Sequence, residues 1–182
     1  EINKKELLKL ILEKNIKLID YENIRNENGK RYLGFGRFAG IVGCYNTLNL
    51  CLKNYNKQPL ARAHRINNYE RLITNLKNLY FPQINILVTG DGRVARGVIE
   101  VLEQTNIKEV SKEKFRNDKF NYPVFCNLET KDYVESKLNK EFDLNHFIQY
   151  PKEYKGCAIQ YLKRADVLIS AHYWDPASPK IF

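Results

Sequence analysis

Two glycines, Gly90 and Gly92, have the spacing of a loop that holds the phosphates of a nucleotide. They lie in the segment ILVTGDGRVARGVIEVL, where Ala95 completes a G-x-G-x-x-A pattern between an apolar run and an amphipathic run. In such a loop the first glycine permits the sharp turn out of a strand, and the second lets the backbone approach a pyrophosphate. Ala95 would let the following helix lie close on the sheet. The sequence therefore predicts that phosphates meet free N–H groups at the positive end of a helix.

The other residues of this loop are Asp91, Arg93 and Val94. Arg93 falls in the first turn of the expected helix, where its positive charge could add to phosphate binding. An ordinary tight turn with two glycines is the alternative interpretation. The apolar run before the loop and the apolar face of the helix after it favour the nucleotide site, because a dinucleotide fingerprint requires that context.

The residue that contacts the adenosine ribose would decide between NAD and NADP, and the sequence leaves this choice open. An acid about 20 positions after the loop, at the end of the second strand, binds the ribose hydroxyls of NAD. That region is NIKEVSKEKF, in which Ser111 and Lys112 follow the strand and could accommodate the 2′-phosphate of NADP. Alternatively the register differs by two residues, and Glu109 or Glu113 binds the ribose.

A later apolar segment, ADVLISAHYW, ends in residues that would border the nicotinamide. Ligands of an open parallel sheet bind at the carboxyl ends of its strands, so Ser170, Ala171, His172 and Tyr173 are further cofactor-binding candidates. His172 could act as an acid or a base, because the unperturbed pKa of histidine is close to neutrality. The alternative is a histidine of the pocket wall that packs against the ribose or hydrogen-bonds to it.

These candidates require strands and helices that alternate from residue 84 onward. Short apolar runs predict strands at Ile84–Thr89, Lys108–Val110, Val124–Asn127, Phe147–Gln149 and Val167–Ala171. Amphipathic patterns predict the intervening helices at 92–104, 130–138 and 156–164. The alternation is typical of an α/β protein, and with the glycine loop it predicts a Rossmann-type doubly wound parallel sheet.

The residues before this sheet predict a mixture of helices, turns and one strand. In chain order these are a helix at 3–14, a strand at Ile16–Tyr21, a turn at Asn26–Lys30, a helix at 36–50 and a helix at 68–80. The helix at 36–50 is rich in glycine, alanine, cysteine and threonine. We therefore expect it to pack very close to another backbone.

Composition and charge narrow the class of protein. Of the 182 residues, 43% are hydrophobic and 28% charged, so a folded core is expected. The net charge is +9, without a Lys/Arg block interleaved with aromatics, so we expect no nucleic-acid partner. No apolar run approaches the roughly 20 residues of a membrane span, so we expect no membrane partner. The four cysteines lack CxxC or zinc spacing, which predicts a reduced, cytoplasmic protein without a metal site.

Two segments resemble the alanine dehydrogenase/transhydrogenase family, and most closely its lysine-forming saccharopine dehydrogenases. They are LIDYENIRNENGKRYLGFGRFAGIVG, before the glycine loop, and ADVLISAHYWDPASPK, after it. The resemblance implies a two-domain NAD- or NADP-dependent enzyme that oxidises the CH–NH group of an amino acid, or reduces the imine of a 2-oxo acid and an amine. These small-molecule substrates would bind in the cleft between the domains.

Carried over residue by residue, the resemblance assigns Glu22 to an acid that tunes the catalytic groups and Arg31 to an arginine near the oxo-acid carboxylate. It implies that residues 1–33 are the tail of a catalytic α/β domain and that residues 34–182 form the NAD(P)-binding domain. The family's principal catalytic lysine and histidine precede the matched segment, and the sequence contains no methionine. We therefore expect a fragment that mainly supplies the cofactor site.

Two questions stay open at this point. A non-catalytic nucleotide-binding or regulatory module that keeps the same fold is the alternative to an enzyme, because fold does not fix function. The helix at 36–50 could pack against the other domain or against a second copy of the chain in a homo-oligomer.

Overall fold

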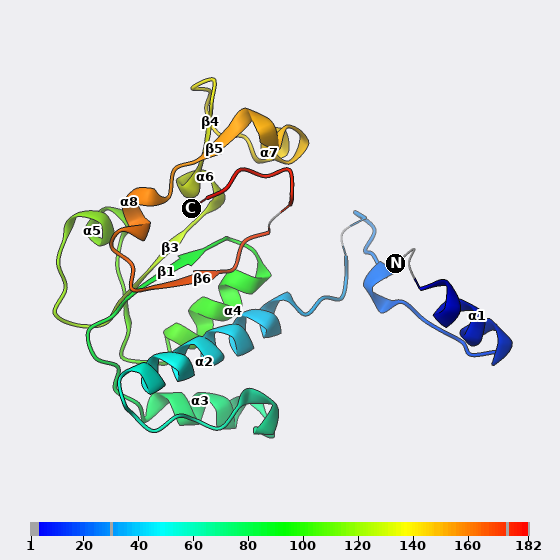
Figure 1. Ribbon diagram of the computed structural model, residues 1–182, viewed down its shortest axis with the longest axis horizontal. Helices are drawn as coiled ribbons and strands as arrows, with labels where there is room; N and C mark the ends of the chain where they lie inside the picture. The colour runs from blue at the N-terminus through cyan, green and yellow to red at the C-terminus, as the bar shows by residue number, and fades with distance from the viewer. Residues whose placement is uncertain (1–3, 30, 174, 182) are drawn as a thin grey trace. The chain divides into compact units, whose positions relative to one another are not determined.

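The chain divides into two compact units, Glu1–Phe35 and Gly36–Phe182. The computed structural model in Figure 1 describes residues 4–29, 31–173 and 175–181. The larger unit carries the sheet and every cofactor-binding candidate, whereas the smaller one carries Glu22 and Arg31.

The described residues of the smaller unit include the α-helix α1 at Lys5–Glu13, which confirms the first predicted helix. Residues 16–20 form no strand, so the predicted strand at Ile16–Tyr21 is wrong. The carboxylate of Asp20 accepts a hydrogen bond from the backbone N–H of Glu22 at 2.9 Å and so begins the 3-10 turn η1 at Tyr21–Asn23. This local bond competes with the extended conformation that the apolar run favours.

The turn predicted at Asn26–Lys30 is present over its described residues, and Lys30 lies outside them. Gly29 has a φ of 71° and its N–H donates to the carbonyl of Asn26 at 2.9 Å. Glycine suits this position because a side chain disfavours the left-handed region.

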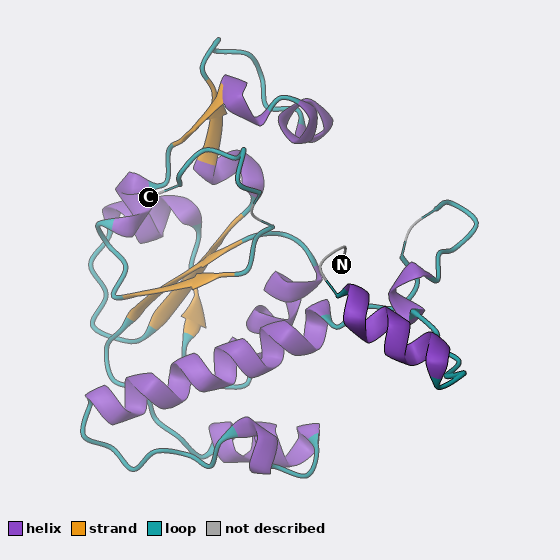
Figure 2. Cartoon of the chain, turned by 45° about the vertical axis from the view of Figure 1, so that its right-hand side comes forward, coloured by secondary structure: helices purple, strands orange, loops and turns teal. Residues whose placement is uncertain are grey.

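The larger unit is built on a parallel sheet, shown in Figure 2. Its strands are β1 at Asn85–Thr89, β2 at Lys108–Glu109, β3 at Val124–Leu128 and β6 at Val167–Ser170. Their spatial order is β2-β3-β1-β6, and each neighbouring pair is parallel. The predicted α/β class is therefore confirmed. The second strand along the chain, however, lies at the sheet edge, and the third lies beside β1.

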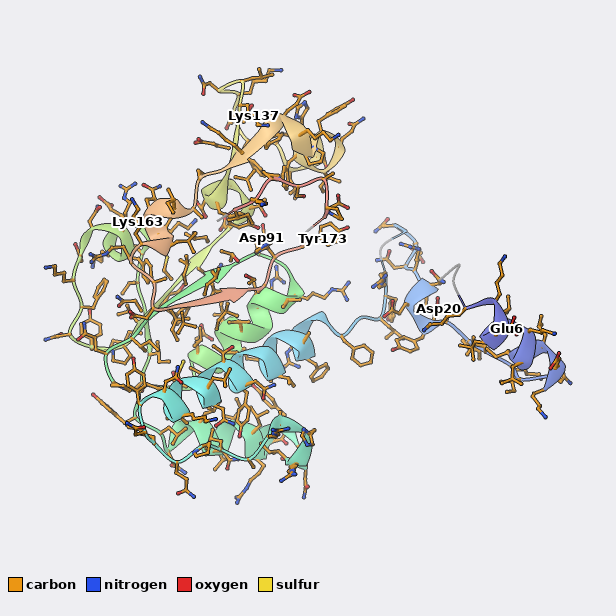
Figure 3. All side chains as sticks on the ribbon, viewed as in Figure 1. Glu6, Asp20, Asp91, Lys137, Lys163 and Tyr173 are labelled. Atoms are coloured by element: carbon orange, nitrogen blue, oxygen red, sulfur yellow. The ribbon has the colours of Figure 1, made fainter. Side chains whose placement is uncertain are left out.

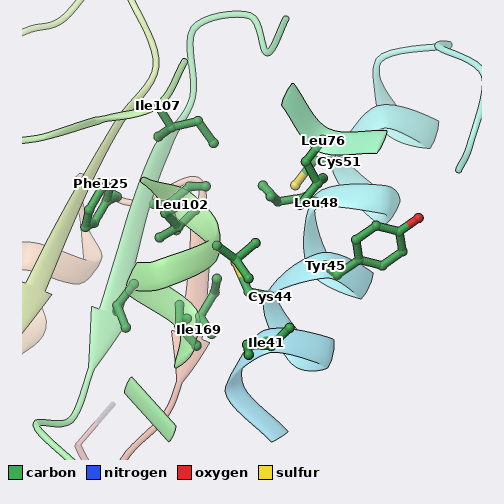
Figure 4. Packing of buried hydrophobic residues seen from close by; sticks show 14 of the residues in the cluster. Ile41, Cys44, Tyr45, Leu48, Cys51, Leu76, Leu102, Ile107, Phe125 and Ile169 are labelled. Atoms are coloured by element: carbon green, nitrogen blue, oxygen red, sulfur yellow. The ribbon is translucent and has the colours of Figure 1, made fainter. Parts of the chain in front are cut away.

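Helices cover both faces of this sheet. One face carries α2 at Gly36–Asn54, α3 at Tyr69–Lys77 and α4 at Arg93–Leu102, and the other carries α5 at Lys112–Asn117, α6 at Thr130–Tyr133 and α8 at Ile159–Leu162. A short 3-10 turn, η2 at Ala63–Arg65, connects α2 with α3. The side chains of β1 alternate between the two cores, with Ile86 and Val88 in the first and Leu87 in the second. Figure 4 shows the first core, where Cys44 and Leu48 of α2 pack with Leu102 of α4.

Two glycines allow α2 and α4 to cross at backbone contact. A methyl group placed on Gly40 would lie 2.0 Å from the carbonyl oxygen of Val94, and one on Gly97 would lie 2.1 Å from that of Arg37. The expectation that the small-residue helix packs against another backbone is thus confirmed, and α4 is the helix that it meets. The crossing fixes α4, and with it the loop that begins this helix.

A small antiparallel sheet replaces two of the predicted elements. It consists of β4 at Val134–Ser136 and β5 at Tyr154–Gly156, with α7 at Leu144–Gln149 and the 3-10 turn η3 at Pro151–Glu153 between them. The predicted helix at 130–138 therefore stops at Tyr133. The helix predicted at 156–164 shrinks to α8.

The strand predicted at Phe147–Gln149 is wrong, because these residues end helix α7. The carboxylate of Asp143 accepts a hydrogen bond from the backbone N–H of His146 at 2.6 Å, which starts the helix just before the apolar run. No helix in the described part of the chain combines the length and the apolar character that crossing a membrane would need.

Candidate functional site

The glycine loop lies at the carboxyl edge of the sheet, where β1 ends. Gly90 has a φ of 121°, and its N–H donates to the carbonyl of Leu128, the last residue of β3, at 2.8 Å. A methyl group on Gly90 would lie 2.6 Å from the carbonyl oxygen of Ala171, just beyond β6. This glycine is required because the chain turns out of the strand between two neighbours that leave no room for a side chain.

Gly92 stands in a different environment, directly before α4. Its φ of −84° and ψ of −168° are extended backbone, and a methyl group placed on it would meet no atom within 4 Å. No side chain of the N-cap residue closes the start of the helix. The N-terminal amide groups of α4 and the positive end of its dipole therefore lie beside open space. Ala95 is 1% exposed and packs in the core under the loop, as the spacing predicts.

A cavity of about 490 Å³ opens in front of this loop. Eight of the predicted cofactor-binding residues line it: Asp91, Gly92, Arg93, Val94, Ser170, Ala171, His172 and Tyr173. Figure 3 shows Asp91 and Tyr173 at this edge of the sheet. The opposite wall is mainly apolar and comes from α6, β4, α7 and the C-terminal segment. The structure thus brings together residues that lie about 80 positions apart in the sequence.

His172 is fixed at the floor of this cavity by a hydrogen bond with a buried threonine. Its Nδ1 lies 2.7 Å from Oγ1 of Thr89, which is 1% exposed, and its ring packs on the ring of Tyr133 with 5.4 Å between centroids. Burial lowers the pKa of His172, so the ring is neutral at neutral pH. When Thr89 donates its hydroxyl proton to Nδ1, the ring proton is on Nε2, and the histidine is a hydrogen-bond donor there.

The structure does not bring Ser111 to the loop. Ser111 follows the edge strand β2, which β3 separates from β1, and its hydroxyl accepts a hydrogen bond from the backbone N–H of Lys114 at 3.3 Å at the start of α5. The ammonium group of Lys112 lies 2.6 Å from the carboxylate of Asp132. The Lys112 charge therefore lies at the start of α6, where it also acts on Glu129, whereas the Ser111 hydroxyl is engaged at the start of α5.

An acid that the sequence analysis did not consider, Glu129, directly follows β3. Because β3 is the neighbour of β1, Glu129 lies at the end of the strand beside the one that carries the glycine loop, but it is not among the residues that line the cavity. One signal could have found it: VFCNL is longer and more apolar than the two-residue strand β2, and long apolar runs are typical of central parallel strands.

In the smaller unit, Glu22 and Arg31 lie together. The Arg31 guanidinium is 3.6 Å from the Glu22 carboxylate, and both side chains are about half exposed, at 49% and 51%. The two residues that the resemblance places in catalysis thus form an ion pair within their own unit.

Fold and site together define a parallel α/β domain of Rossmann-like architecture, with a glycine loop and a cavity at the carboxyl edge of its sheet. In the described residues, no group of three or more His, Cys, Asp or Glu side chains could hold a metal ion. No model of a known protein family matches the chain.

The chain is similar to alpha-aminoadipic semialdehyde synthases over nearly its whole length. It is 28% identical to the Arabidopsis thaliana protein over 208 residues, which is 95% of this chain and 20% of the relative. It is 24% identical to the mitochondrial protein of Rattus norvegicus over 202 residues, which is 96% of this chain and 21% of the relative. The chain thus spans about a fifth of the length of these relatives. They support a resemblance to saccharopine-dehydrogenase-like proteins and do not single out alanine dehydrogenase.

Proposed function

We propose that this chain is the cofactor-binding part of an NAD- or NADP-dependent oxidoreductase that acts on the CH–NH group of an amino acid. The observation that carries the proposal is the open space at Gly92. Gly92 stands at the start of α4 with open space where a side chain would be, and it faces a cavity that also reaches the end of β6. A pyrophosphate needs this close approach to the amide groups of a helix N-terminus.

The residues around the cavity form two groups, one suited to the pyrophosphate of a dinucleotide and the other to its nicotinamide. The backbone N–H groups from Gly92 to Val94 would bind the pyrophosphate, and the Arg93 side chain would add positive charge. The end of β6, from Ser170 to Tyr173, would border the nicotinamide. His172, neutral and held by Thr89, would donate a hydrogen bond through Nε2 at this end of the cavity.

The substrate class comes from the similarity to alpha-aminoadipic semialdehyde synthases together with the saccharopine-dehydrogenase-like motifs. When bound, the nicotinamide cofactor supplies a hydride acceptor or donor for the carbon that bears the amine nitrogen. The chain's own residues orient that cofactor and close one side of the cavity. Arg31 would bind the carboxylate of a 2-oxo acid, and Glu22 would hold the charge of Arg31 in place through their ion pair.

The test is a titration of the full 182-residue chain with NADH and with NADPH, followed by cofactor fluorescence and by calorimetry. Saturable binding of at least one cofactor is expected. The chain carries a net charge of +9, which could attract any anion unspecifically. Binding in the cavity should persist in about 0.3 M salt, where that unspecific attraction is screened. Inorganic pyrophosphate serves as the control anion and should compete only weakly.

The absence of saturable binding for both cofactors would refute the proposal. If a cofactor binds, a panel of amino acids and of amine and 2-oxo acid pairs then tests for turnover. Binding without turnover would favour the non-catalytic nucleotide-binding module for this chain taken alone.

A further inference from the structure

A second cavity, of about 540 Å³, lies between α3 and the segment that connects α2 with it. Among the described residues, none lines both this cavity and the one at the glycine loop. Figure 1 shows that α2 lies between α3 and the sheet. The second cavity is therefore a separate place in the larger unit, and its volume is in the range of pockets that hold small molecules.

The charged groups of this cavity are cationic. Arg65 and Arg71 bring two guanidinium groups to it, and over the described part of the chain no carboxylate lines it or forms an ion pair with either arginine. In the sequence of residues 55–83, Glu70 is the only acid. Three carboxamides complete the polar lining: Gln58, Asn67 and Asn75. The cavity therefore offers positive charge and several hydrogen-bond donors to an anion.

Hydrogen bonds from α2 hold one wall of this cavity in place. The hydroxyl of Tyr45, a residue buried in the core, donates to the carbonyl of Ala61 at 2.8 Å. The Asn49 carboxamide accepts a hydrogen bond from the N–H of Leu60 at 2.7 Å and donates one to the carbonyl of Leu60 at 3.1 Å. Because Leu60 and Ala61 both line the cavity, this wall is fixed in advance, which lowers the entropy cost of binding.

The floor of the cavity is apolar. Leu60, Ile66 and Leu79 line it and pack, partly buried, against the core between the helices and the sheet. Arg71 and Asn75 are four residues apart on α3, so they share the helix face beside this floor. A guanidinium group binds a carboxylate through two parallel hydrogen bonds, and an apolar floor favours a hydrocarbon chain over water.

We propose that this cavity binds a small carboxylate with an aliphatic chain, whose carboxylate contacts Arg65 and Arg71 and whose chain covers the apolar floor. The inference goes beyond the proposed function and does not depend on it. Inorganic phosphate would contact the arginines but leave the floor in water. A neutral molecule with the same chain would cover the floor but lack the charge that the arginines attract. Both should therefore bind more weakly than the carboxylate.

The test titrates the full chain with hexanoate in about 0.15 M salt, which screens unspecific attraction, and follows the backbone amide signals by NMR. Three further probes separate the contributions. Hexanamide has the chain without the charge, acetate has the charge without a long chain, and inorganic phosphate is a different anion. Hexanoate should shift the signals of Arg65, Asn67 and Asn75 saturably, and the other three probes should bind more weakly.

Variants of single arginines test the contact with the carboxylate. Arg65→Gln and Arg71→Gln should each weaken hexanoate binding by about threefold to tenfold, the weight of a partly exposed hydrogen bond to a charged group. Arg62→Gln is the matched control. It removes the same charge from the same connecting segment, but Arg62 lines the neighbouring groove and not this cavity, so the Kd should stay the same.

The comparison of the four probes uses the unchanged chain, so it decides the question even if a variant does not fold. The proposal is overturned if hexanoate does not bind saturably, or if the shifted signals belong to the glycine loop at residues 90–95. It is also overturned if Arg62→Gln weakens binding as much as Arg71→Gln does, or if phosphate binds more tightly than hexanoate. None of these results bears on the cofactor site, because NADH binding is measured at the other cavity.

Discussion

Replacing Gly92 by alanine should weaken cofactor binding without unfolding the chain. Gly92 has extended backbone angles, with φ at −84°, which any residue adopts. A methyl group there would meet no protein atom within 4 Å, so nothing in the folded chain resists it. The same methyl group would stand in the open space before α4 that the pyrophosphate is proposed to fill.

Two small terms determine the effect of Gly92→Ala on stability, and they oppose each other. Alanine restricts the unfolded chain and so stabilises by about 0.4–1 kcal/mol at a position without strain. Alanine is also a poorer N-cap than glycine, which costs on the order of 0.5 kcal/mol. The free energy of unfolding should therefore change by less than about 1 kcal/mol. Binding should suffer more, because losing one hydrogen bond to a charged phosphate costs about 1.5–3 kcal/mol, or roughly tenfold to a hundredfold in Kd.

Gly90→Ala is the contrasting variant for this experiment. Gly90 has a φ of 121°, and a methyl group on it would meet the backbone carbonyl of Ala171 at 2.6 Å. Strain and overpacking together should destabilise the fold by at least about 2 kcal/mol. Urea unfolding gives the stabilities, and NADH fluorescence gives the Kd. The reasoning fails if Gly92→Ala binds NADH like the unchanged chain, or if it unfolds as readily as Gly90→Ala.

Three further predictions test the structure around the site. Gly97→Ala should destabilise the fold by about 1–3 kcal/mol, because its methyl group would lie 2.1 Å from the carbonyl oxygen of Arg37 in α2. Gly43→Ala is the control in the same urea unfolding experiment. It should stabilise the fold by about 0.5–1 kcal/mol, because its methyl group would meet no atom within 4 Å. Burial lowers the pKa of His172, so its contribution to stability is complete above the unfolded value of 6.5 and is lost as the pH falls below it. His172→Gln should therefore make the free energy of unfolding, measured in urea, less dependent on pH below 6.5. Gly156→Ala should speed trypsin cleavage after Lys180, because its methyl group would lie 2.3 Å from the Lys180 carbonyl and displace that segment.

The local patterns that the sequence predicts best are those with strong periodicity or a special backbone requirement. The apolar run before Gly90 becomes β1, and the amphipathic run after Gly92 becomes α4. Short apolar runs were ambiguous between helix and strand. Phe147–Gln149 joined a helix because Asp143 caps it, and Ile16–Tyr21 stayed out of any sheet because Asp20 turns the chain. In both places one side-chain hydrogen bond to the backbone outweighed an apolar pattern.

The sequence by itself determines that a glycine loop stands between a strand and a helix, because the apolar run before Gly90 and the amphipathic run after Gly92 are local patterns. It also determines which later strand end carries His172. Only the tertiary structure decides which strand lies beside β1. Strand order depends on packing between residues far apart in the sequence, and no fixed spacing of residues predicts it. That decision places β3 beside β1 and β2 at the edge of the sheet, so that Glu129, and not Ser111, follows the strand next to the glycine loop.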